Sequence, residues 1–277
     1  MTILIFSLIL LAGAYFAGLV GSLTGLGGGV VVIPLLTLVF HVDIRYAIGA
    51  ALLASIANSS GAASAYVKEG ITNIRLGMFL EIATTIGAIL GALIAVYTPT
   101  NTIAILFGVI LLFSAAMTLR KKNQEALLEG SLLSYRLKLN GSYPTKDGVV
   151  EYKLTNVAGG FSMMAFAGVI SGLLGIGSGA LKVLAMDTLM RIPFKVSTTT
   201  SNFMIGVTAA ASAVVYLQRG YMDPGIAFPV IIGVLGGSFT GAKLLTKIDA
   251  GVLRIIFCVA ITFVALEMIY NGYQHKF

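Results

Sequence analysis

The sequence predicts an all-α integral membrane protein made of two inverted repeats. Each repeat is a glycine-broken helical hairpin followed by three transmembrane helices, and a small cytoplasmic β-hairpin insert lies between them. Three observations lead to this fold class: a composition too apolar for water, a repeat at an offset of 150 residues, and the placement of the basic residues. They divide the chain into a first transmembrane repeat (1–119), a cytoplasmic linker (120–156) and a second transmembrane repeat (157–277).

The composition indicates lipid as the solvent of this chain. Of its 277 residues, 57% are hydrophobic and only 10% are charged, whereas a soluble domain carries roughly 25% charged residues. At about 20 residues per crossing, the length allows roughly eight to ten membrane segments. The net charge of +7 sits mainly in short loops, which is typical of topology control in membrane proteins. Membrane lipid is therefore an expected partner, and nucleic acid is not.

The repeat is visible when the sequence is compared with itself at an offset of 150. Without a gap, 19 of the 100 positions from 16 to 115 are identical to their counterparts. The strongest matches are glycines, with Gly25, Gly27 and Gly29 falling on Gly175, Gly177 and Gly179. Shared glycine spacing over so long a register favours two copies of one unit over a coincidence between apolar helices.

The apolar segments follow the same order in both copies. The first copy has segments at 3–40 (broken at 24–29), 46–66, 76–97 and 101–119. The second has segments at 157–190 (broken at 175–179), 196–217, 225–246 and 251–270. In the polar linker, Tyr135–Leu139 and Val149–Leu154 alternate in polarity on either side of an Asn140-Gly141 turn, which predicts a β-hairpin.

The basic residues predict the direction of the two copies. If each broken segment turns back as a hairpin, the copies run in opposite directions across the membrane; if each crosses once, they run the same way. With the basic linker placed in the cytoplasm, the hairpin interpretation puts thirteen basic residues inside and three outside, against eleven and five for single crossings. Because cytoplasmic loops carry an excess of Lys and Arg, we expect inverted repeats with both termini extracytoplasmic.

The two glycine breaks are the first candidate site. Each helical glycine costs about 1 kcal/mol relative to alanine, and the backbone groups freed by a break cannot face lipid. Matching breaks in two repeats indicate the binding site of a transporter, and the exposed N–H groups at the start of a half-helix favour an anion. Close packing of small residues between helices is the alternative. The candidate residues are Thr24, Gly25, Gly27, Gly28 and Gly29 in the first copy, and Gly175, Gly177, Ser178 and Gly179 in the second.

The segment after each break is rich in hydroxyl and amide side chains, which bind oxyanions without a fixed charge. They can equally bond their own backbone or a neighbouring helix. The candidates are Asn58 and Ser59 in the first copy, and Thr199, Thr200, Ser201 and Asn202 in the second.

Few charges fall within apolar segments. Lys182 follows the second break, where it would attract an anion, pair with Asp187, or reach an interface. Glu81 and Glu267 are candidate proton carriers, although a structural role near an interface is the preferred interpretation of both.

Two motifs resemble the sulfite exporter TauE/SafE family of membrane transporters. They are the glycine-rich run Gly18–Gly29 followed by Pro34, and its counterpart Gly168–Gly179. The resemblance covers nearly the whole chain except the linker. It implies transport of a small sulfur-containing anion, such as sulfite, thiosulfate or an organosulfonate like sulfoacetate, across the cell membrane of a prokaryote. Lys182 and the long charged linker depart from the pattern of this family.

A secondary transporter is therefore the leading hypothesis, with an anion channel that uses the same breaks as a filter as the alternative. The sequence contains no Walker, HExxH or GxSxG motif, so we expect neither an enzyme nor a cofactor. One cysteine and two histidines are too few for a metal cluster, so no metal is expected either. The oligomeric state, including a homo-oligomer, stays open.

Overall fold

The computed structural model describes residues 3–24, 27–68, 70–119, 130–145, 148–244 and 250–274. The first half contains α1 (Ile3–Thr24), α2 (Gly29–Pro34), the π-helical segment η1 (Leu35–Val39), α3 (Ile44–Lys68), α4 (Ile74–Tyr97) and α5 (Thr100–Leu119). The insert contains α6 (Leu132–Arg136), β1 (Gly141–Thr145) and β2 (Gly148–Tyr152). The second half contains α7 (Val157–Leu174), α8 (Gly179–Leu184), the π-helical segment η2 (Ala185–Leu189), α9 (Phe194–Gln218), α10 (Pro224–Leu244) and α11 (Ala250–Tyr273).

These helices confirm the predicted all-α membrane class. Within the described residues, six helices are long and apolar enough to cross a membrane, namely α1, α3, α4, α7, α9 and α10. The small two-stranded sheet of the insert is confirmed as well. Both helical segments predicted to be broken end a long helix and start a short one within a few residues.

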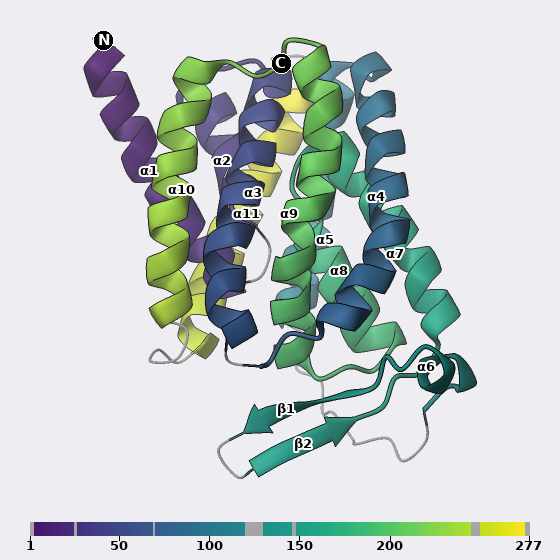
Figure 1. Ribbon diagram of the computed structural model, residues 1–277. Helices are drawn as coiled ribbons and strands as arrows, with labels where there is room; N and C mark the ends of the chain where they lie inside the picture. Colours follow the sequence, from purple (N-terminus) through teal and green to yellow (C-terminus); the bar gives the residue numbers. More distant parts are fainter. Residues whose placement is uncertain are drawn as a thin grey trace.

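Helix packing repeats between the two halves, as the ribbon in Figure 1 shows. Helix α1 lies along α10, and its counterpart α7 lies along α4. Helix α3 contacts α10, and its counterpart α9 contacts α4. In addition, α3 packs on its counterpart α9, and α5 packs on its counterpart α11. Each half therefore completes the other, because the largest interfaces pair a helix of one half with a helix of the other.

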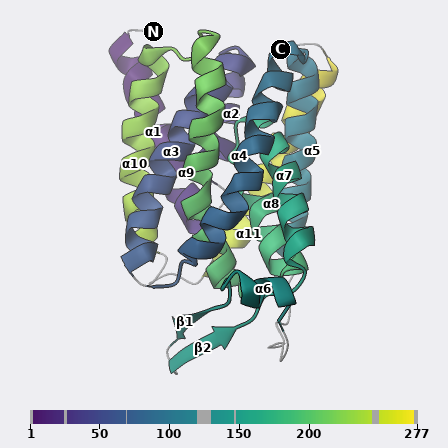
Figure 2. The same ribbon diagram turned by 45° about the vertical axis from the view of Figure 1, so that its right-hand side comes forward.

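Both chain termini lie at one end of the helix bundle, and the insert lies at the other (Figures 1 and 2). Helix α5 leads toward the insert, and α7 leads away from it. The direction of the two repeats across a membrane stays a prediction.

Glycines outside the breaks let pairs of helices touch backbone to backbone. A Cβ added to Gly237 of α10 would lie 1.9 Å from the carbonyl oxygen of Tyr15 in α1. At the matching position of the other copy, a Cβ on Gly87 of α4 would lie 2.2 Å from the carbonyl oxygen of Ala165 in α7. These two glycines therefore allow close helix packing, as small residues usually do between membrane helices.

The predicted limits of the hairpin were wrong at its first strand. Residues 132–136 form α6 instead, because Ser131 caps the helix by accepting a hydrogen bond from the N–H of Ser134. The strands pair antiparallel from Gly141 opposite Tyr152 to Thr145 opposite Gly148. The Asn140-Gly141 pair precedes the hairpin rather than forming its turn, and the Asn140 side chain accepts from the N–H of Leu154.

Asn73 ties the insert to the helix bundle. Its side-chain oxygen caps α4 by accepting from the N–H of Leu76 at 3.0 Å. Its amide nitrogen donates to the carbonyl of Leu139 and to the hydroxyl of Tyr152, both at 2.9 Å. Its backbone N–H donates to the hydroxyl of Thr200 in α9 at 3.1 Å. One residue thus connects α4, α9 and the insert.

The attachment of the insert should weaken at high pH because of Tyr152. Burial raises the pKa of its phenol from 10.0 to about 12, against a smaller lowering from the Asn73 hydrogen bond. The unfolded chain therefore loses this proton first, so the contribution of Tyr152 to stability is present below pH 10 and is lost as the pH rises through 12. The melting temperature should fall across this range.

In Tyr152→Phe, the fall in melting temperature between pH 10 and pH 12 that Tyr152 causes should disappear. The loss of the Asn73 hydrogen bond should lower the melting temperature of this variant at all pH values. Tyr135→Phe, which removes the hydroxyl of a half-exposed tyrosine in the same insert, is the matched control. Identical pH profiles for the wild type and Tyr152→Phe would contradict the prediction.

Candidate functional site

Each break is a short turn between a long helix and a half-helix. In the second copy, α7 ends at Leu174 and the chain passes through Gly175 (φ +69°), Gly177 (φ +68°) and Ser178 (φ +47°) before α8 begins. In the first copy, Gly27 has φ +85° just before α2. Left-handed backbone is readily adopted by glycine, which explains why glycines recur at these turns.

The two breaks lie against each other. A Cβ added to Gly29 would be 2.9 Å from the carbonyl oxygen of Gly175, so the start of α2 touches the end of α7. Ile205 of α9 lies beside both breaks: a Cβ on Gly27 would be 3.6 Å from it, and one on Gly177 would be 2.8 Å from it. The structure thus brings together the glycines that the repeat had paired by position.

Of the other candidate residues at the breaks, the structure places Gly28 and Gly179, but it describes little or nothing of Thr24 and Gly25. Gly28 packs on α10, where its Cβ would lie 3.2 Å from Val234, and Gly179 begins α8. Gly25 lies outside the described residues, and of Thr24 only its place at the end of α1 is described.

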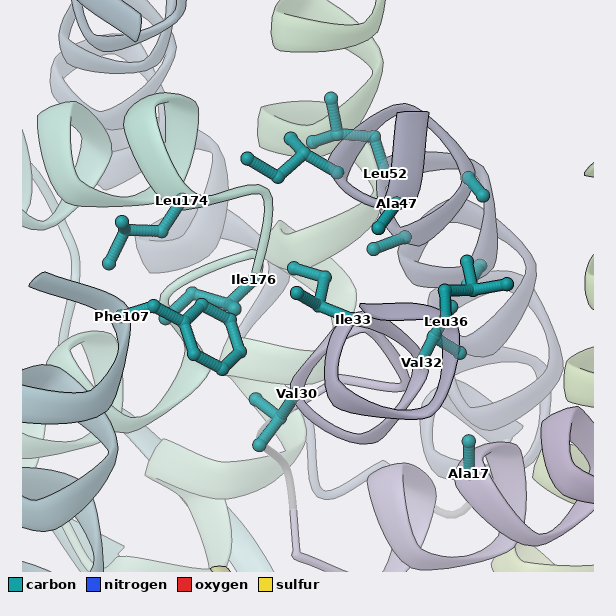
Figure 3. Packing of buried hydrophobic residues seen from close by; sticks show 14 of the residues in the cluster. Ala17, Val30, Val32, Ile33, Leu36, Ala47, Leu52, Phe107, Leu174 and Ile176 are labelled. Carbon is teal, nitrogen blue, oxygen red and sulfur yellow. The ribbon is translucent and has the colours of Figure 1, made fainter. Parts of the chain in front are cut away.

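A small cavity opens where the two half-helices begin. It is lined by Val30 of α2, by Ile110, Leu111 and Ser114 of α5, by Ile176 and Ser178 of the second break, and by Gly179 and Leu181 of α8. Figure 3 shows the hydrophobic packing around two of these lining residues, Ile176 and Val30, with Phe107 beside Ile176 and Ile33 nearby. Both half-helices therefore direct their first turns toward one place.

The hydroxyl groups of the predicted cluster are bonded to backbone groups. Ser59 donates to the carbonyl of Asn202, and Ser201 to the carbonyl of Gly179 at 3.2 Å. Thr199 donates within its own helix, and Thr200 accepts from Asn73. Three of these hydroxyls, those of Ser59, Thr200 and Ser201, connect α3, α8 and the start of α4 to α9, as the structural alternative for this cluster expects.

The amides of the cluster behave differently. Asn58 of α3 and Asn202 of α9 are fully buried, and neither their oxygens nor their nitrogens have a hydrogen-bond partner within the described protein. The same holds for the hydroxyls of Ser55, which lies against Gly29, and of Ser178 at the cavity. Buried polar groups without partners cost free energy and call for an explanation such as a ligand or water.

Lys182 has a partner that was not predicted. Its side chain is wholly buried, and its Nζ lies 3.8 Å from Oε2 of Glu81 in α4. The Thr208 hydroxyl of α9 lies between them, accepting from Lys182 and donating to Oε1 of Glu81. The ion pair that the structure shows for Lys182 is thus with Glu81, whereas the predicted alternative was Asp187, which lies on η2.

One signal in the sequence does mark this cluster. Thr208 occupies the repeat position of Asn58, so both copies carry a polar side chain at the same depth of the same helix. Glu267, the other acidic candidate, lies exposed on α11.

Comparison with known proteins agrees with the architecture. The family model described as "Sulfite exporter TauE/SafE" matches residues 10–268. The "Probable membrane transporter protein YunE" of Bacillus subtilis (strain 168) is 28% identical over 95% of this chain and 97% of its own length. A "Probable membrane transporter protein" of Xylella fastidiosa (strain 9a5c) is 26% identical over 96% and 97%. No solved structure matches the chain.

Proposed function

Because this chain belongs to the sulfite exporter TauE/SafE family of membrane transporters, we propose that it is a secondary transporter of a small sulfur-containing anion. Sulfite, thiosulfate and organosulfonates such as sulfoacetate are the proposed substrates, and the plasma membrane is the proposed location. The relatives are named as membrane transporters without a substrate, so the proposed anion rests on the family and on the site.

The cavity at the breaks is the observation that carries this proposal. The helices that begin there continue without interruption to Val39 and Leu189 through their π-helical segments. Helix N-termini attract anions through their free N–H groups and the helix dipole. The unpartnered hydroxyl of Ser178 adds a donor at the same place. Together these groups fit an oxyanion, which accepts several hydrogen bonds at once.

The proposed transport cycle depends on inverted repeats. In this proposal the linker is cytoplasmic, the termini are extracytoplasmic, and the two halves rock around the breaks to open the cavity to either side. The placement of both termini at the end opposite the insert supports this orientation (Figure 2).

Anion binding should weaken when Ser178 is replaced by alanine. A hydrogen bond to a charged group is worth about 1.5–3 kcal/mol, so the dissociation constant should rise roughly 10- to 100-fold. The measurement is calorimetry on purified protein with sulfite, thiosulfate, sulfate and sulfoacetate, and with acetate as the carboxylate control. Thr199→Val is the matched variant, because that hydroxyl is bonded within its own helix, and it should bind like the wild type.

Two outcomes would contradict the proposed function. Absence of binding for every sulfur anion would remove the substrate assignment, and equal affinity in Ser178→Ala would remove the site. In liposomes, saturable uptake with counterflow is expected of a carrier, and flux near the diffusion rate would favour the channel.

A further inference from the structure

Lys182, Thr208 and Glu81 form a buried charged cluster that no feature of anion binding requires. They come from α8, α9 and α4, so the cluster joins three helices of the bundle. Lys182 is fully buried, while Glu81 keeps 7% of its surface exposed. Burial of an ion pair in a membrane protein is expensive, and intramembrane charges usually have a function.

The two carboxylate oxygens of Glu81 have different surroundings. Oε1 accepts hydrogen bonds from the hydroxyls of Thr208 and Thr85, the second at 3.4 Å. Oε2 faces the ammonium of Lys182 at 3.8 Å, beyond hydrogen-bond distance, and accepts no hydrogen bond from the part of the chain that the structure describes. Oε2 is therefore the atom on which a proton can bind without displacing an existing donor.

The cluster lies next to the proposed anion site. Lys182 is one helical turn beyond Ser178, and its N–H donates to the Ser178 carbonyl at 3.0 Å. The preceding residue, Leu181, lines the cavity. A charge placed in the cavity therefore lies within one turn of helix of the ion pair, at a depth where charges are poorly screened.

The nearby elements add few other ionisable groups. Helices α5 and α7 carry none. On α4 the others are Arg75 in the first turn and Tyr97 at the last position. On α9 they are Lys195 in the first turn and Tyr216 near the end. On η2 it is Asp187, five residues beyond Lys182. The charge balance around the cavity therefore depends chiefly on Glu81 and Lys182.

The geometry points to Glu81 and Lys182 as a proton-binding site that couples anion transport to proton movement. This inference rests on the proposed function. With the anion absent, the pair is neutral as carboxylate and ammonium. When an anion occupies the cavity, the site gains net negative charge, one unit for hydrogensulfite and two for sulfite, thiosulfate or sulfoacetate, which is costly in a low-dielectric interior. Uptake of one proton by the Glu81 carboxylate removes one of these charges, so the anion and the proton travel together.

Coupling of this kind is reciprocal. If the bound anion strengthens proton binding at Glu81, protonation of Glu81 must strengthen anion binding by the same factor. A protonated Glu81 also leaves the positive charge of Lys182 uncompensated, and this charge then attracts the anion. Glu81 lies seven residues into α4, about 10 Å from the helix start at the insert end, which makes the insert end the nearer source of protons.

The test uses purified protein in liposomes with sulfite or sulfoacetate as the transported anion. Counterflow exchange measures anion transport alone, and a pH-sensitive dye measures protons that move with it. Glu81→Gln keeps the shape of the side chain but cannot bind the proton. It should retain counterflow and lose accumulation driven by a pH gradient by about tenfold or more. Glu267→Gln, at an exposed site on α11, is the control and should keep both.

The outcomes separate this inference from the proposed function. Absence of counterflow in the wild type contradicts the proposed function. Counterflow in the wild type without proton movement, or proton-driven accumulation that persists in Glu81→Gln, overturns the coupling site. If Glu81→Gln does not fold, the variant Glu81→Gln/Lys182→Met, which removes both charges, takes its place. Its anion binding should weaken because the ammonium is gone, and the number of protons moved per transported anion should fall as in Glu81→Gln; unchanged proton movement per anion would overturn the coupling site.

A measurement without transport tests the proton site directly. Acidification of the purified wild type should produce the infrared band of a protonated carboxylic acid, and addition of sulfite should shift its appearance to higher pH. The part of this band assigned to Glu81 should be missing in Glu81→Gln. The same band and the same sulfite effect in both proteins would overturn the inference.

Discussion

Replacing Lys182 by methionine should lower the free energy of unfolding by roughly 3–5 kcal/mol, because it leaves the buried Glu81 carboxylate without its partner. Methionine fills a similar volume, so the loss comes from the charge rather than from a cavity. The Thr208 hydroxyl also loses the ammonium that donates to it. Thermal unfolding of purified protein in detergent, read as a lower melting temperature, is the measurement.

The variant that removes both charges provides the control. Glu81→Gln/Lys182→Met should recover most of the lost stability, since buried ion pairs replaced by neutral groups of similar volume are often close to neutral in effect. A melting temperature for Lys182→Met near that of the wild type would contradict the importance of the pair. A double variant as unstable as the single one would assign the loss to packing.

Replacing Gly237 by alanine should have a comparable effect through packing alone. The added Cβ would lie 1.9 Å from the carbonyl oxygen of Tyr15, and a backbone atom cannot rotate away as a side chain can. Helices α1 and α10 must then separate along their contact, at a cost of about 1–3 kcal/mol or more. The expected result is a lower melting temperature and reduced yield of folded protein.

Its neighbour Gly236 is a matched control on the same helix. A Cβ there would lie 3.5 Å from the ring of Tyr15, an ordinary contact. Gly236→Ala should be neutral or slightly stabilising, by up to about 1 kcal/mol, because alanine favours the helix. Equal melting temperatures for the two variants would show that the α1–α10 contact is looser than the structure has it.

The broad architecture was predictable because it depends on local patterns. Each apolar segment and each glycine break consists of consecutive residues, and comparing the sequence with itself at an offset of 150 pairs the two copies. The hairpin was placed correctly in the linker, but its first strand was not. Alternation at Tyr135–Leu139 fits a strand, yet a capping serine outside that pattern starts a helix there.

Long-range partners were not predictable from the sequence. Lys182 and Glu81 lie in different copies, and the packing of both α8 and α4 against α9 brings them together. The predicted cluster of hydroxyl and amide side chains also grouped residues that have different roles. Sequence alone does not distinguish Thr200, which accepts a hydrogen bond from Asn73, from Asn202, whose amide has no partner among the described groups.

The contact of α1 with α10 also bears on how the chain assembles as it is synthesised. The hydroxyl of Tyr15 donates to Thr240, a partner 225 residues further along. Helix α1 is therefore synthesised long before α10 and must enter the bilayer without its main partner, with only α2 and α3 to contact at first. Its 22 residues include no charged side chain, so lipid can hold it during that time. The α4–α7 contact forms earlier, and the closing step of biogenesis is the arrival of α10 and α11.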